Sequence, residues 1–209
     1  DIGCGTGRIV ERYAHHFDPV VCLEADESRL NLAKRITLKN PLQEVEYVHG
    51  RFGIASLHGV FDFVTCIQVV QHIPSTILNY WLKSVYQQLS RRGIFILVTT
   101  RESRDRYSLS NGKNVDEYEF NKRAYGDTDS GVLAVRKFSE VFLTRAFRRN
   151  GFYIVEHRNF VYNNLKEPTH QIIVAAKRKV RSIDAKVHTH SIYVSPQVLA
   201  LKQKQKLKC

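Results

Sequence analysis

The hydrophobic pattern of residues 1–100 switches repeatedly between short apolar runs and longer stretches with helical spacing. The runs at 19–24 and 61–67 are typical of strands that are buried on both faces of a parallel sheet. Residues 8–17 and 74–92 instead repeat apolar positions every three or four residues, which predicts helices. Strands that alternate with helices predict an α/β domain whose parallel sheet carries helices on both faces.

The same pattern places the remaining elements of this first half. A helix is predicted from Asp26 to Lys39, and a short strand at 45–49. Pro74 is expected to open the next long helix and Gly93 to end it, because proline suits a first helical turn and glycine a helix end. Residues 94–99 then form a further buried strand.

The regular alternation stops at residues 101–136, which are rich in Ser, Asn, Gly and Asp. A long excursion after the carboxyl end of a strand commonly carries function, so we interpret it as a lid or an insertion that binds the acceptor of a reaction. Residues 138–150 return to helical spacing, with Ser139 as the expected N-cap. The last two strands are predicted at 152–156 and 169–176, where they can pair as a hairpin.

The length, composition and charge of the chain indicate a single domain followed by a basic tail. The chain has 209 residues, of which 43% are hydrophobic, and its formal net charge is +12. From residue 177 onward, nine Lys and Arg residues face only one acidic residue, Asp184, so most of the charge lies in the tail. We assign residues 1–178 to the domain and 179–209 to a flexible, solvated tail, in preference to a tail that binds nucleic acid or a membrane.

The cysteines and histidines do not form a metal-binding pattern. The four cysteines are Cys4, Cys22, Cys66 and Cys209, and none share a C-x-x-C spacing. Reduced, mostly buried thiols in a cytoplasmic protein are expected, without a metal site. We find no secretory signal or membrane-length apolar run. Because the chain lacks Met and opens inside a motif that normally follows a strand, we expect it to be a fragment whose upstream strand is missing.

The first seven residues, Asp1-Ile2-Gly3-Cys4-Gly5-Thr6-Gly7, carry the clearest chemical signal. Glycines at every second position between a strand and a helix allow backbone to approach a ligand closely. The spacing G-x-G-x-G differs from the G-x-G-x-x-G of dinucleotide-binding proteins. Glu24 ends the next predicted strand, where a carboxylate can accept hydrogen bonds from ribose hydroxyls.

These residues resemble motif I and the acidic residue of the class I S-adenosylmethionine (SAM) dependent methyltransferases. The resemblance implies an α/β fold with a seven-stranded, mostly parallel sheet, and SAM as the cofactor. By this resemblance the glycine loop holds the methionine part of SAM, Asp1 lies near its amino group and Glu24 binds the ribose. The implied cofactor-binding residues are Asp1, Gly3, Cys4, Gly5, Gly7, Glu24, Ala25, Arg51, Phe52, Ile67 and Gln68.

The chain departs from the family pattern after its third strand. The family usually has a Gly-Asp step there, whose Asp binds the adenine amino group, but this chain has Gly50-Arg51. Arginine cannot accept a hydrogen bond from an amine. We therefore expect the backbone and ring of Phe52 to hold the adenine; the alternative is that the family's acidic position aligns a few residues away.

The segment 66–74 resembles the step after strand four in the methyltransferases that act on small molecules, which implies that Ile67 and Gln68 line the cofactor and that His72 faces the acceptor. His72 has a suitable pKa to act as a base if the acceptor must lose a proton. The alternative is that His72 only caps or packs the following helix.

Three functions follow from this resemblance. The preferred one is methyl transfer to an oxygen, nitrogen or carbon atom of a small molecule. The second is an RNA or protein methyltransferase. Its support is the tail and five arginines expected near the carboxyl edge of the sheet: Arg91, Arg92, Arg101, Arg104 and Arg106. No Asn/Asp-Pro-Pro-Tyr-like step supports it. The third is a non-catalytic relative that binds a partner, suggested only by Arg51.

Overall fold

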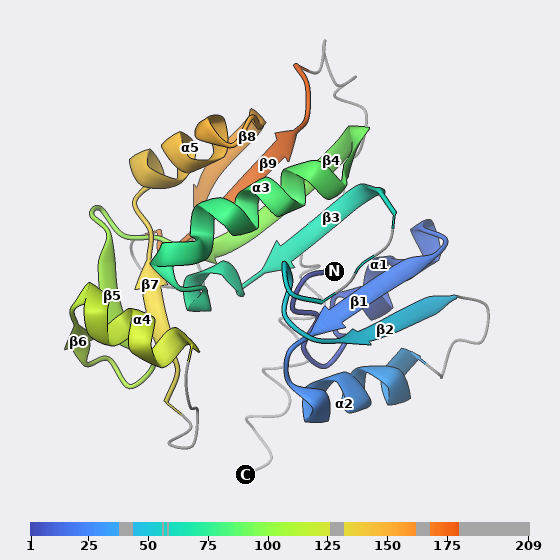
Figure 1. Cartoon of the computed structure of the whole chain (residues 1–209), viewed down its shortest axis with the longest axis horizontal. Helices are drawn as coiled ribbons and strands as arrows, with labels where there is room; N and C mark the ends of the chain where they lie inside the picture. The colour runs from blue at the N-terminus through green and yellow to red at the C-terminus, as the bar shows by residue number, and fades with distance from the viewer. Residues whose placement is uncertain (38–43, 56, 58, 126–131, 162–167, 180–209) are drawn as a thin grey trace, which may run out of the picture. The chain divides into compact units, whose positions relative to one another are not determined.

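The computed structural model describes residues 1–37, 44–55, 57, 59–125, 132–161 and 168–179 (Figure 1). The α-helices are α1 (Val10–Tyr13), α2 (Glu27–Thr37), α3 (Leu78–Gln88), α4 (Glu117–Tyr125) and α5 (Glu140–Arg149). The strands are β1 (Val20–Glu24), β2 (Val45–His49), β3 (Phe61–Ile67), β4 (Leu89–Thr100), β5 (Arg106–Leu109), β6 (Asn114–Val115), β7 (Ala134–Lys137), β8 (Tyr153–Phe160) and β9 (His170–Ala176). Short 3-10 helices cover Ala14–His16, Val70–His72 and Ser75–Ile77.

The strands of the main body form two groups. Strands β1 and β2 pair in parallel, and a second sheet has the order β3-β4-β9-β8. Strand β4 is parallel to β3, whereas β9 is antiparallel to both β4 and β8. The prediction of an α/β fold with a terminal antiparallel hairpin is therefore confirmed, although the described residues form split sheets.

The first residues of the chain lie between these two groups. Ile2 forms a parallel bridge to Leu23 of β1 and another to Cys66 of β3. Its neighbours extend the pairing, because the Leu23 amide donates to the Asp1 carbonyl at 3.0 Å and the Ile2 amide donates to the Thr65 carbonyl at 2.8 Å. The glycine loop that follows is thus anchored to both β1 and β3.

Two hydrophobic clusters hold the helices against the strands. One joins α3 and α5 to β3, β4 and β9, and its centre contains Trp81, Phe95 and Phe147, all at most 2% exposed. The other joins the first two helices to β1 through small and branched side chains, including Leu30 and Ala33. Burying a large apolar side chain contributes roughly 1.5–3 kcal/mol, so these clusters fix where the strand ends lie.

Two predicted helices differ in detail from the structure. The first is short, with α1 followed directly by a 3-10 turn. The prediction that Gly93 ends a helix is wrong, since α3 ends at Gln88 and Gly93 lies inside β4. A Cβ at Gly93 would lie 2.9 Å from the Phe61 carbonyl and 2.7 Å from the Leu89 side chain, so glycine is needed there for close strand packing.

Residues 101–137 contain a small folded unit. Strands β6, β5 and β7 form an antiparallel sheet in that order, and α4 packs on it (Figure 1). Its buried centre consists of Leu109, Phe120 and Ala134. We call this β5–β6–α4–β7 unit the insertion; it has regular structure that the sequence pattern did not predict.

Some predictions lie outside the described residues: the basic tail beyond residue 179, Cys209, and the end of the helix predicted to Lys39. Among the described helices, none is long and apolar enough to cross a membrane. The described residues also contain no group of His, Cys, Asp and Glu arranged to hold a metal ion. Cys4, Cys22 and Cys66 are buried free thiols, as predicted.

Candidate functional site

The three loop glycines all have positive φ angles, but they serve different purposes. A Cβ at Gly3 would lie 2.2 Å from a Val69 methyl group, and one at Gly7 would lie 3.1 Å from the Ala33 side chain. These two glycines therefore allow close packing inside the protein. At Gly5, in contrast, nothing lies within 4 Å of an added Cβ. Gly5 is the position where the loop backbone faces open space.

Glu24 connects the end of β1 to this loop. Its Oε2 accepts a hydrogen bond from the Gly5 amide at 2.8 Å, and its Oε1 accepts from the amides of Ala25 and Asp26 at 2.9 and 3.0 Å. Glu24 is only 8% exposed. Because a carboxylate offers about four acceptor positions, Oε2 keeps capacity for one more donor.

Asp1 is fixed by side chains from two other elements. Thr65 donates its hydroxyl proton to Asp1 Oδ1 at 2.6 Å, and the Tyr13 hydroxyl lies 3.1 Å from Thr65 Oγ1. Burial raises the pKa of Tyr13, so it stays a neutral phenol in this network. The sequence placed Asp1 at the site but did not indicate Thr65 or Tyr13, which occur in ordinary strand and helix patterns.

Cys4 contributes to the loop through its backbone. Its side chain lies in the cluster with Val10 and Cys22. A hydrogen bond with Cys22, together with burial, raises the pKa of the Cys4 thiol. The thiol is therefore a protonated core group, and only the main chain of Cys4 is placed to bind a ligand.

Gln68, directly after β3, has a left-handed backbone with a φ of 61°. Non-glycine residues rarely adopt this conformation, and such residues cluster at functional sites. Gln71 holds the Gln68 side chain by donating to its Oε1 at 2.8 Å, and the buried Thr99 hydroxyl donates to Gln71 Oε1 at 3.0 Å. Gln71 and Thr99 thus support a predicted site residue, although the sequence analysis did not assign a role to either of them.

His72 lies against the insertion. Its Nδ1 is 2.7 Å from the carbonyl oxygen of Ala134 in β7, which makes Nδ1 the donor and leaves Nε2 as an acceptor. Burial lowers the pKa of His72 below its usual value, so the ring is neutral near pH 7. The N-cap residues of α3 and of the 3-10 turn before it are Ile77 and Pro74, so His72 does not cap the following helix.

Phe52 and Arg51, the two residues expected at the adenine, have different surroundings in the structure. The ring of Phe52 packs edge-on against Trp81, with ring centres 5.6 Å apart. Phe52 also lines a small cavity of about 30 Å³ beside Leu23 and Phe63. Arg51 is exposed, and its carbonyl accepts from Ile54 and Ala55 in a tight turn.

A polar cluster around Ser75 joins the insertion to the start of α3. The Ser75 amide donates to Asn121 Oδ1 at 2.8 Å, and Arg136 Nη1 donates to Ser75 Oγ at 3.0 Å. Arg136 is buried, pairs with Asp105 at 2.5 Å and lies 4.1 Å above the ring of Phe142. We call Ser75, Asp105, Asn121 and Arg136 the anchor cluster; sequence reasoning missed it because its members are far apart in the chain.

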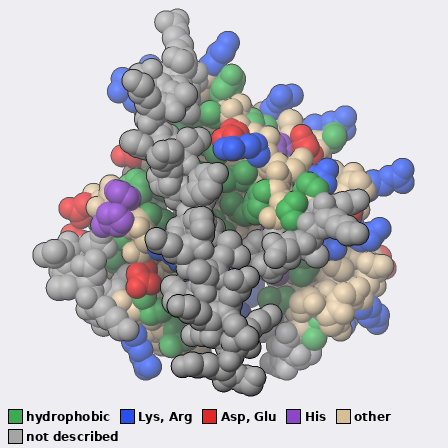
Figure 2. Space-filling view, turned by 180° about the vertical axis from the view of Figure 1, so that it is seen from behind, with side chains coloured by type: hydrophobic (Ala, Val, Ile, Leu, Met, Phe, Trp, Pro, Cys, Tyr) green, Lys and Arg blue, Asp and Glu red, His purple; other side chains and the backbone are tan. Residues whose placement is uncertain are grey.

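Two of the five arginines that suggested nucleic-acid binding are not where the sequence analysis expected them. Arg91 and Arg92 lie at the beginning of β4, whereas Arg101 follows its carboxyl end, about 30 Å away at the usual rise of a strand. The prediction that all five arginines gather at the carboxyl edge is therefore wrong. On the visible part of the face in Figure 2, Lys and Arg side chains are scattered and form no continuous stripe.

The arrangement of Gly5 and Glu24 suits a ligand that carries ribose hydroxyls. Open space in front of Gly5 leaves room for it, and Glu24 Oε2 retains acceptor capacity. Both lie at the carboxyl end of β1, where ligands bind in open α/β sheets. This is the arrangement that the resemblance to class I methyltransferases leads us to expect at a SAM site.

Comparisons with known proteins agree with this class. Residues 1–93 match the family model described as "Methyltransferase domain". A SAM-dependent methyltransferase from Clostridium acetobutylicum superimposes with a TM-score of 0.64 at 15% identity, covering 84% of this chain and 82% of that chain. The glycopeptide N-methyltransferase MtfA, solved with SAM, gives a TM-score of 0.63 at 14% identity, covering 85% and 80%. Residues 1–93 of the chain therefore resemble a methyltransferase domain, and the fold of the chain is that of SAM-dependent methyltransferases of known structure.

Sequence relatives cover a smaller part of the chain. The mitochondrial ubiquinone biosynthesis O-methyltransferase of Schizosaccharomyces pombe is 30% identical over 101 residues, which is 47% of this chain and 36% of the relative. The ubiquinone biosynthesis O-methyltransferase of Aromatoleum aromaticum is 37% identical over 76 residues, or 35% of this chain and 32% of the relative. The matched regions thus span about a third of these relatives.

Proposed function

We propose that this protein transfers a methyl group from SAM to a small-molecule acceptor. The observation that carries the proposal is the junction of Gly5 and Glu24, which combines open space over a backbone turn with a carboxylate that has one free acceptor position. The family match over residues 1–93 supports it, since this segment contains the whole junction.

When bound, SAM supplies a methyl group that is already activated by its positive sulfur. The chain's task is then to bind and orient, which supplies much of the rate in a displacement of this kind. In our proposal Glu24 holds the ribose, the backbone of residues 3–7 and Asp1 hold the methionine part, and Ala25 and Gln68 line the site. The remaining proposed cofactor contacts are Ile67 and the main chain of Arg51 and Phe52.

His72 is proposed as the base for an acceptor that must lose a proton. A neutral ring with Nδ1 committed to Ala134 presents Nε2 as the proton acceptor. Relatives named as ubiquinone biosynthesis O-methyltransferases favour a hydroxyl group as the acceptor. The insertion then bounds the acceptor side, since the carbonyl that orients His72 belongs to β7.

We also infer that the two sheets of the main body act as one seven-stranded sheet. Ile2 bridges β1 and β3, so Asp1–Gly3 occupies a strand position between them. Counting this position gives the order β2-β1-(1–3)-β3-β4-β9-β8, and only β9 runs against its neighbours. Hydrogen exchange should show slow amides in both β1 and β3, and fast exchange in only one of them would contradict the inference.

The function is tested by incubating the protein with SAM labelled in its methyl group and two sets of acceptors. One set carries phenolic hydroxyl groups and the other carries primary amines on the same rings. We expect label in the hydroxyl set and demethylated SAM in equal amount. SAM binding without transfer to either set would contradict the small-molecule activity, whereas absence of SAM binding would contradict the cofactor site.

A further inference from the structure

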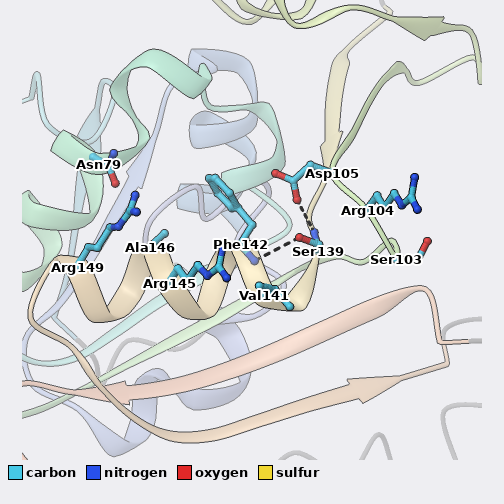
Figure 3. A pocket seen from close by; sticks show the side chains of 10 residues that line it. All are labelled: Asn79, Ser103, Arg104, Asp105, Ser139, Val141, Phe142, Arg145, Ala146 and Arg149. Carbon is cyan, nitrogen blue, oxygen red and sulfur yellow. Dashed lines mark hydrogen bonds between the residues drawn. The ribbon is translucent and has the colours of Figure 1, made fainter.

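A second hollow lies away from the proposed cofactor site, in the groove between α3 and α5 (Figure 3). Its volume is about 400 Å³, which is within the range of small-ligand sites. One wall is α5, and the other sides come from Asn79 of α3 and from residues 103–105 before β5. It includes none of the loop glycines, Glu24, Gln68 or His72.

The lining of this hollow is positively charged. Arg145 and Arg149 lie one turn apart on α5, and Arg104 lies at the opposite end (Figure 3). In Figure 3 the Arg149 side chain extends from α5 toward Asn79, while Arg145 runs along the helix beside Phe142. Two like charges at this spacing repel each other slightly, so an anion between them would stabilise both.

The one carboxylate in the lining is already neutralised. Asp105 Oδ2 pairs with Arg136, and Asp105 Oδ1 accepts from the Ser139 amide at 2.7 Å. Arg136 is 3% exposed, pairs with Asp105 and lies over the ring of Phe142, so its charge is not available to a ligand in the hollow. Arg104, Arg145 and Arg149 thus line the hollow, and no acid other than the paired Asp105 lines it with them.

The remaining lining limits the kind of anion. Val141, Phe142 and Ala146 provide an apolar wall on α5, directly beside the arginines. Guanidinium groups match the geometry of phosphate oxygens, and an apolar wall suits an organic group attached to that phosphate. A nucleic-acid strand would need further basic residues that continue the row of phosphate contacts beyond the hollow. Arg91 and Arg92 do not continue it, because they lie at the beginning of β4, whereas Arg104 follows the carboxyl end of that strand.

We propose that this hollow binds the phosphate monoester of a small organic molecule. Arg145 and Arg149 hold the phosphate, Arg104 closes the site from the opposite end, and the organic group contacts Val141 and Phe142. The site is separate from methyl transfer, so it stands or falls independently of the proposed function.

The test is calorimetric titration of the full chain with phenyl phosphate, which combines a phosphate with an apolar ring, at about 0.15 M salt. We expect saturable binding with a Kd of about 1 mM or tighter. Arg145→Gln and Arg149→Gln should each weaken binding about tenfold, as loss of one charged hydrogen bond predicts. Glutamine has a helix propensity close to that of arginine, so α5 is retained.

Arg148→Gln is the matched control, because Arg148 is exposed on the same helix but does not line the hollow. It should change the affinity by less than about twofold, since an exposed charge that does not contact the ligand is largely screened at this salt concentration. SAM binding should be equal in all variants. The proposal would be overturned if phenyl phosphate showed no saturable binding, or if Arg148→Gln weakened binding as much as the other two substitutions. It would also be overturned if single-stranded RNA bound more tightly than phenyl phosphate and all three substitutions weakened RNA binding alike.

Discussion

The cofactor side and the insertion side of this protein are held together by different kinds of contact. On the cofactor side, Glu24 accepts from three backbone amides, and Asp1–Gly3 is bonded to the main chains of β1 and β3. On the insertion side, the anchor cluster consists mainly of side-chain contacts around Ser75 and Arg136. The glycine loop needs a backbone turn and one carboxylate at a strand end, whereas the anchor cluster needs several particular side chains from distant segments.

This difference indicates where specificity is encoded. A glycine turn with an acidic strand end can bind a common cofactor in many sequences, so a motif describes it well. The insertion positions Ala134 against His72 through residues that no motif includes. Acceptor choice is therefore expected to follow the insertion, and substitutions on the two sides should separate cofactor binding from acceptor turnover.

The largest expected effect is on turnover. His72→Gln should lower kcat for a hydroxyl acceptor by about 100- to 10,000-fold, the usual contribution of a general base. The affinity for SAM should remain unchanged, because His72 belongs to the insertion side. Steady-state kinetics with calorimetric SAM binding measures both, and a kcat loss below tenfold would assign His72 a packing role.

Breaking the anchor cluster should mainly reduce stability. Asp105→Ala leaves the buried Arg136 without its partner, which we expect to lower the free energy of unfolding by about 2–4 kcal/mol. Asp105 keeps 23% of its side chain exposed, so the loss is smaller than for a fully buried pair. Urea unfolding measures it.

Glu119→Ala is the control for Asp105→Ala. It removes an ion pair with Arg123 whose side chains are 33% and 39% exposed, and it should cost at most about 0.5 kcal/mol. Equal losses in the two variants would show that the anchor cluster contributes no more than a surface pair.

Two glycine substitutions separate packing from ligand binding on the cofactor side. Gly3→Ala should destabilise the fold by roughly 2–3 kcal/mol, because the new Cβ meets Val69 in a left-handed backbone. Gly5→Ala should cost only about 1 kcal/mol, since its Cβ enters open space. Thermal unfolding measures these losses of stability. SAM titration should nevertheless show that Gly5→Ala lowers the affinity for SAM more than Gly3→Ala does. Equal affinity for SAM in the wild type and in Gly5→Ala would mean that SAM does not contact the backbone at Gly5.

The smallest expected effect is that of pH on the reaction rate and on stability. Burial lowers the pKa of His72 below 6.5, so the ring stays neutral and competent from pH 8 to below 6.5. The rate should fall only at lower pH, as the ring becomes protonated. The unfolded chain binds this proton more readily, so the stability due to His72 is complete above about pH 6.5 and decreases as pH falls further. A pH–rate profile with its acid limb above 6.5 would contradict this.

Local patterns predicted the strands well but not the contacts between distant segments. The run at 61–67 corresponds to β3 in full, because a strand in the middle of a sheet imposes a nearly continuous apolar pattern. Residues 45–49 correspond to β2, in which Val45 and Tyr47 alternate with the polar Glu46. Gly93 was misread as a helix end, since its need for a small side chain comes from Phe61, more than thirty residues earlier. The insertion and its anchor cluster were missed because short polar strands have no distinctive pattern.

The site shows the same limit. The Gly5–Glu24 contact follows from a motif and a strand end, so the sequence was sufficient to suggest it. The orientation of His72 depends on a carbonyl sixty-two residues away, and the packing of Phe52 on Trp81 depends on the core. Long-range packing decides such details.

The central claim is that Glu24 and the glycine loop bind SAM, and calorimetric titration of SAM into the wild type and Glu24→Ala tests it most directly. We predict binding by the wild type and a loss of at least about tenfold in Glu24→Ala, as removal of a charged acceptor implies. Circular dichroism would verify that the variant is folded. Equal SAM affinity in the two folded proteins, or no binding to the wild type, would contradict the claim.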